Sequence, residues 1–145
     1  MPVYPKPNTQ PIYPKKIFTW RGELLNQVIT IPVPISNTLQ TVLPIKLGEA
    51  QEAGALIWAF HIALPLPYYG HFHFYSRRTG DTNLVQRWMH LVNTSDLFSF
   101  QVCNLPAILP NEQKGLHLEA GEELFVMMQI AVTSPITVIA VGGHY

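Results

Sequence analysis

Apolar and β-branched residues recur along the chain in short runs, and groups of proline, glycine, asparagine, aspartate and serine separate these runs. Runs of this length between turn-forming residues are typical of β-strands. Breaks such as Pro34-Ile35-Ser36-Asn37 and Thr79-Gly80-Asp81 fall where turns would join the strands. The eight predicted strands cover residues 26–33, 39–46, 55–63, 71–76, 84–92, 97–103, 123–133 and 136–141.

Eight short strands at this spacing predict an all-β fold, and Ser134-Pro135 supplies a tight turn before the last of them. A jelly roll is the eight-stranded sandwich that limits exposed sheet edges. We therefore expect an eight-stranded jelly-roll-like β-sandwich at residues 21–145, preceded by an extended Pro-rich N-terminal arm at residues 1–20. Residues 84–92 have a helical alternative, because Leu84, Trp88, Leu91 and Val92 would share one face of a helix.

Composition narrows the classes of partner. At 145 residues the chain suits one domain, and its nine basic and nine acidic residues cancel. A neutral chain has no basic patch for nucleic acid or for an anionic membrane, and it favours association with other proteins. Residues 124–142 carry no charge, but their polar interruptions and β-branched residues indicate two strands and a turn, not a membrane helix. No apolar segment typical of a secretory signal follows the N-terminal charges.

The C-terminal part carries a resemblance. The segment Leu116-His117-Leu118-Glu119-Ala120-Gly121-Glu122-Glu123-Leu124-Phe125-Val126 resembles the turn and penultimate strand of many jelly rolls, and Ile136-Thr137-Val138-Ile139-Ala140-Val141-Gly142-Gly143 is similar to their last strand. Capsid proteins, tumour-necrosis-factor-like trimers, lectins and cupins share this pattern. The resemblance therefore implies a fold more than a function.

The segment Gly70-His71-Phe72-His73-Phe74 invites comparison with the cupin metal site, which begins with two histidines on one strand face. The cupin pattern then requires a glutamate where this chain has Arg77 and Arg78, and a later histidine where it has Val126, Met127 and Met128. We expect Phe72 and Phe74 in the core, with His71, His73 and Tyr75 on the opposite, polar or interfacial face. A metal site would need His61 and His90 to converge on the pair, and we predict no metal and no cofactor.

Other catalytic arrangements are equally sparse. The nine carboxylates lie in predicted turns or at strand ends, so none is obviously held in an apolar pocket that would tune its pKa. No nucleophile elbow, phosphate-binding loop or dinucleotide fingerprint is present in the sequence. Cys103 lies in a predicted strand without a nearby base, and we interpret it as an inert thiol. Arg77-Arg78 is interpreted as a contact for a partner carboxylate or as a solvated turn. The sequence thus predicts a protein that is not an enzyme.

The N-terminal arm holds five of the 13 prolines and two near-copies of one phrase, Val3-Tyr4-Pro5-Lys6 and Ile12-Tyr13-Pro14-Lys15. Proline at this density excludes helix and central strand, so an extended segment results whose backbone has no internal partners. Such a segment loses little entropy when it docks on another protein. Phe18 and Trp20 mark where the arm joins the domain. The predicted partner-binding residues are Val3, Tyr4, Pro5, Lys6, Ile12, Tyr13, Pro14, Lys15, Phe18 and Trp20.

An arm, a jelly-roll-like body and a neutral surface together resemble the architecture of bacteriophage capsid decoration proteins, also called cement proteins. The resemblance implies a homotrimer on the virion surface that binds the major capsid protein or other shell subunits and stabilises the capsid by bridging them. The alternative is a carbohydrate- or receptor-binding module of a head fibre or tail, to which some of the aromatic residues would contribute, although the alternation assigns several of them to the core: Trp58, Tyr68, Tyr69, Tyr75 and Trp88. A cupin-like enzyme and a wall or tail subunit of a virus-like shell are further alternatives.

Overall fold

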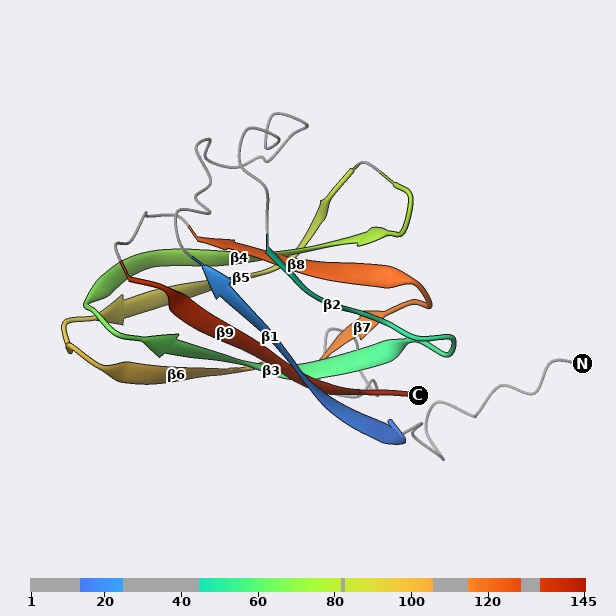
Figure 1. The fold of residues 1–145 in the computed structure, drawn as a ribbon, viewed down its shortest axis with the longest axis horizontal. Coiled ribbons are helices and arrows are strands. Elements are labelled where there is room, and N and C mark those ends of the chain that lie inside the picture. Colours follow the sequence, from blue (N-terminus) through green and yellow to red (C-terminus); the bar gives the residue numbers. More distant parts are fainter. Residues whose placement is uncertain (1–13, 25–44, 82, 106–114, 129–133) are drawn as a thin grey trace, which may run out of the picture.

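The computed structural model describes residues 14–24, 45–81, 83–105, 115–128 and 134–145. They form nine strands in two antiparallel sheets that pack as a sandwich (Figure 1). The strands are β1 (Lys16–Leu24), β2 (Ile45–Glu49), β3 (Ala55–Leu64), β4 (Tyr68–Arg78), β5 (Val85–Thr94), β6 (Ser99–Asn104), β7 (Leu116–Leu118), β8 (Glu122–Met128) and β9 (Ile136–His144).

The order of the strands confirms the predicted jelly-roll-like sandwich. The five-stranded sheet has the order β1-β9-β3-β6, with the short β7 also paired to β3, and the four-stranded sheet has the order β2-β8-β4-β5. Most connections cross from one sheet to the other, so each sheet alternates strands from the two halves of the chain, as in a double Greek key. The described residues form nine strands, not the predicted eight, and two of them were not predicted: β1 and the three-residue β7, which pairs with β3.

The strand predictions hold where the alternation of side chains is clear. Residues 55–63, 71–76 and 136–141 lie inside β3, β4 and β9, and the segment 84–92 forms β5. The helical alternative for that segment is wrong, because β5 pairs with β4 along its whole length. The predicted strand 26–33, most of 39–46 and residues 129–133 lie outside the described residues.

The boundary between arm and sandwich differs from the prediction. Residues 16–24, which the sequence analysis divided between the arm and the domain, form β1 and pair with β9 from Lys16↔His144 to Leu24↔Ile136. Side chains alternate along this strand, with Phe18, Trp20 and Leu24 toward the core. The sequence analysis did not recognise this alternation, because the prolines before residue 16 indicated an extended arm. The sandwich therefore begins by Lys16, and the arm prediction for residues 1–13 lies outside the described residues.

The core lies between the sheets. Phe60 of β3 and Phe74 of β4 stack across it with ring centroids 3.7 Å apart, and both are fully buried. Phe72 is buried in the same cluster, as predicted. Tyr75 lies on the opposite face of β4, as predicted, but it is fully buried there with Phe125 and Met127, so the face is not polar at this position. Among the described residues no helix has the length and apolar character that crossing a membrane requires.

Candidate functional site

Four of the ten predicted partner-binding residues lie in the described part of the chain: Pro14, Lys15, Phe18 and Trp20. The backbone N–H of Lys15 donates a hydrogen bond to the carbonyl of His144 at 2.8 Å. This bond continues the β1–β9 ladder by one residue before Lys16 and holds Lys15 against the sandwich. Val3, Tyr4, Pro5, Lys6, Ile12 and Tyr13 lie outside the described residues.

Phe18 and Trp20 pack against their own domain. Their rings stack with centroids 4.0 Å apart, and the ring of His144 lies 4.6 Å from that of Phe18. The Trp20 indole occupies the space above Gly48 of β2, where a Cβ atom would overlap it. These two aromatic residues therefore join the edge strands of the two sheets, and only part of each side chain faces solvent.

An exposed apolar edge is the main surface that the sequence analysis missed. Seven large apolar side chains on β5, on β6 and between them are 43–81% exposed: Val85, Met89, Leu91, Leu97, Phe98, Phe100 and Val102. Met89 and Leu91 face outward from the four-stranded sheet, and Phe100 and Val102 face outward from the five-stranded sheet. Isolated exposed apolar residues are normal on protein surfaces, but groups of them indicate interaction sites. This group lies at the sandwich edge opposite β1 and β2, because β6 and β5 are the last strands of the two sheets.

The orientation of β6 is the unusual feature of this edge. Ser99, Gln101 and Cys103 pair with the core residues Leu64, Ile62 and Phe60 of β3 and share their inward face. Phe100 and Val102 consequently point outward beside Ala63 and His61. The polar side of β6 thus faces the interior, and its more apolar side faces solvent. The buried hydroxyl of Ser99 has no hydrogen-bond partner among the described residues.

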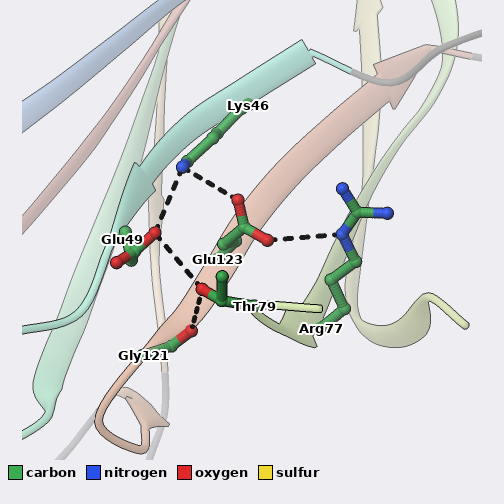
Figure 2. Close-up of polar contacts among 6 residues, drawn as sticks. All are labelled: Lys46, Glu49, Arg77, Thr79, Gly121 and Glu123. Atoms are coloured by element: carbon green, nitrogen blue, oxygen red, sulfur yellow. Dashed lines mark hydrogen bonds and ion pairs between the residues drawn. The ribbon is translucent and has the colours of Figure 1, made fainter. Parts of the chain in front are cut away.

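A network of charges covers the opposite end of the four-stranded sheet, where β2, β4 and β8 meet (Figure 2). The Glu123 carboxylate is 2.8 Å from Lys46 Nζ and 3.4 Å from Arg77 Nε, and Lys46 also contacts Glu49 at 3.3 Å. The Arg77 guanidinium lies 4.9 Å from the ring centroid of Phe125. The hydrogen bond from Lys46 is the main cause that holds the pKa of Glu123 below its ordinary value.

Arg77 and Arg78, interpreted from sequence as contacts for a partner carboxylate, bind carboxylates of their own chain. Arg77 pairs with Glu123, and Arg78 pairs with Glu119. A third arginine, Arg87, lies 3.1 Å from Glu122 and donates a 2.7 Å hydrogen bond to the carbonyl of His117. These pairs connect β4 and β5 with the turn before β8, and their charges cancel locally.

The Glu123 network predicts a pH-dependent loss of stability. Because the folded pKa of Glu123 is depressed, its ion pairs contribute above the ordinary carboxyl pKa of 4.5 and are lost as the pH falls through the folded value. Glu123→Gln should reduce the free energy of unfolding by about 1–2 kcal/mol at neutral pH and by nearly nothing at about pH 3. Urea unfolding at both pH values measures this difference.

Glu23→Gln is the matched control, because the Arg21–Glu23 pair is exposed on both sides and should change stability by less than about 0.5 kcal/mol. An equal loss for Glu123→Gln at both pH values would show that packing of the side chain, and not its charge, is responsible.

The histidines do not converge. His71 and His73 share the outer face of β4 with ring centroids 6.0 Å apart, but His61 lies on the other sheet and His90 pairs with Phe72, on the opposite face of β4. Burial lowers the pKa of His73, and the charge of His71 lowers it further. His73 is itself buried, which corrects the expectation of a polar face there. Within the described residues no three metal-binding side chains form a group.

Cys103 is buried in the core beside Trp88, whose Nε1–H donates to its sulfur at 3.3 Å. Burial raises the pKa of the thiol, so the reactive thiolate is disfavoured at neutral pH. This environment agrees with the interpretation of an inert thiol.

The described residues therefore offer exposed apolar side chains on the outer faces of β5 and β6 and several internally neutralised ion pairs. Searches against known proteins add nothing to this geometry: no protein-family model matches the chain, and no curated protein sequence matches it.

Proposed function

We propose that this protein is a non-enzymatic structural component of a viral shell, which binds the outside of the capsid and stabilises it by bridging major capsid subunits. Jelly rolls also form lectins and cupins, so the fold alone does not select this role. The observation that carries the proposal is the outward apolar side of β6. An edge strand that exposes a row of apolar side chains is stabilised when another protein surface covers them.

The arm adds a second contact to this proposal. Pro14 is described directly before Lys15, whose N–H is tied to His144. In this proposal residues 1–13 are extended, and thirteen residues in polyproline II conformation would span about 40 Å at about 3.1 Å per residue. That length reaches across a neighbouring subunit. In this proposal Tyr4 and Tyr13 are the anchors, and Lys6 pairs with acidic groups of the shell.

Deletion of residues 1–13 tests the arm. The shortened chain keeps Lys15 and all of β1, so its free energy of unfolding should change by less than about 0.5 kcal/mol. Its binding to shells should fall at least about tenfold, because the anchors are gone. The measurement is the number of copies per particle, by quantitative mass spectrometry, after purified particles of the source are mixed with each form and banded on a density gradient.

The matched control is a full-length chain with Tyr4→Ser and Tyr13→Ser, which keeps the length of the arm and should bind as weakly as the deletion. Unchanged binding of the deletion would remove the arm from the proposal. If the protein is missing from banded particles and the sandwich instead binds immobilised glycans, the carbohydrate-binding alternative replaces the shell proposal.

A further inference from the structure

We propose that the outer face of the five-stranded sheet binds the same face of a second copy of this chain, related by a two-fold axis. We call this surface the β6 face and define it by His61 and Ala63 of β3, Phe98, Phe100 and Val102 on and before β6, and Ile139 of β9. The β6 face includes the apolar side of β6 that the shell proposal uses, so in a shell a second copy would cover this face and the N-terminal arm would contact the capsid subunits. The isolated chain is sufficient to test the inference.

The β6 face has the composition of an interface. The strands β3, β6 and β9 contain no aspartate, glutamate, lysine or arginine. Register places Val102, His61 and Ile139 in one row across the sheet, and Phe100, Ala63 and Thr137 in the next. The ring of Phe100 contacts the ring of His61 edge-on, with centroids 5.3 Å apart. In a sheet with one side in solvent, the side chains that point outward are normally polar. Here most of the side chains in the two outward rows are apolar.

The size of the face is sufficient for a specific contact. The whole outer side of the sheet, which consists of β3, β6 and β9 together with the edge strand β1, has four strands about 4.8 Å apart and about eight residues long and covers roughly 500 Å². Two copies packed face to face would therefore bury about 1,000 Å², which is the size at which protein contacts become specific. Two sheet faces pack well when both are flat and apolar, at a separation of about 10 Å.

We infer that the partner is a second copy of the chain because the β6 face carries both a protruding side chain and a hollow that can receive one. Phe98 is 81% exposed and stands beside a shallow apolar hollow of about 450 Å³ that is lined by Ala63, Pro65, Phe100 and Pro135, among others. In a two-fold arrangement the Phe98 ring of each copy can enter the hollow of the other. The chain has no net charge, so copies do not repel each other. The charged side chains on this side of the sheet are Arg21 and Glu23 of β1, at the edge away from β6, and because they pair with each other they do not select a partner of opposite charge.

Sedimentation of the full chain over about 1–200 µM tests the inference. We expect a two-copy species at the upper end that dissociates on dilution. The double variant Phe100→Lys and Val102→Lys should remain a single copy throughout, with association at least about 100-fold weaker, since two buried apolar contacts become charges. The matched control is Met89→Lys with Leu91→Lys on the outer face of the other sheet, where the side chains are 43% and 47% exposed. It should sediment like the unaltered chain.

A single copy of the unaltered chain at about 200 µM, a three-copy species, or equal dissociation of the control would overturn the two-fold contact. Hydrogen exchange of the unaltered chain keeps the test independent of any misfolded variant. Amides of β6 should exchange more slowly at high than at low protein concentration, while those of β2 should not change. Exchange of β6 that is independent of concentration would also overturn the inference.

Discussion

Phe74→Ala should lower the free energy of unfolding by about 3–5 kcal/mol, which is a large part of the stability of a domain of this size. The Phe74 ring is fully buried and stacks on Phe60 of the opposite sheet, so its removal leaves a cavity at the centre of the sandwich. Surrounding strands are held by ladder hydrogen bonds on both sides of β4 and cannot collapse into that space. Urea unfolding at one fixed protein concentration measures the effect.

Phe74→Leu is the matched control for this prediction, because leucine keeps an apolar side chain in the same site and should lose only about 1–2 kcal/mol. A loss below about 1 kcal/mol for Phe74→Ala would mean that the two sheets do not pack through this aromatic pair.

Gly142→Ala should cost at least about 3 kcal/mol, through a backbone collision and not through lost packing. A Cβ atom at this position would overlap the carbonyl oxygen of Leu56 and lie 3.0 Å from the Cα of Ile57. Those atoms belong to β3 at its bulge, where the pairing with β9 shifts between Ile57 and Ala59. The two central strands of the five-stranded sheet must separate to admit the methyl group. Thermal and urea unfolding report this loss.

Gly80→Ala separates this collision from the general cost of replacing glycine. Gly80 has a φ of +94° and no neighbour within 4 Å of a Cβ atom, so its substitution should cost only about 1 kcal/mol. Equal losses at the two positions would show that strands β3 and β9 are less closely spaced than described.

Strands in which apolar and polar residues alternate strictly were predictable from sequence, because this alternation identifies the one face of the strand that is buried. In β4, Phe72 and Phe74 identify the core side, and in β9 the alternation of Ile136, Val138 and Ala140 does the same. β1 was missed because proline dominates the segment before it. The predicted strand ended at Val141, although the resemblance to the last jelly-roll strand included Gly142 and Gly143, and in the structure these glycines allow close approach to β3 and to Pro14.

The candidate interaction surface could not be predicted from alternation. In Phe98-Ser99-Phe100-Gln101-Val102 the apolar positions would normally be assigned to the core. Pairing with β3 gives the opposite result, because the register places Cys103 beside Phe60 and fixes every second residue with it. The charged pairs around Glu123 were also out of reach, since they join residues of β2, β4 and β8 that are far apart in the chain.

By itself the sequence determined the all-β class, the sandwich architecture and the neutral character of the surface. These properties follow from local alternation, turn residues and composition, which act over a few neighbouring residues. Only the tertiary structure decided which side of β6 faces solvent, where the arm gives way to β1 and which carboxylate each arginine binds. These features depend on the register between strands that are distant in sequence, and a shift of one residue in that register exchanges the two faces of a strand.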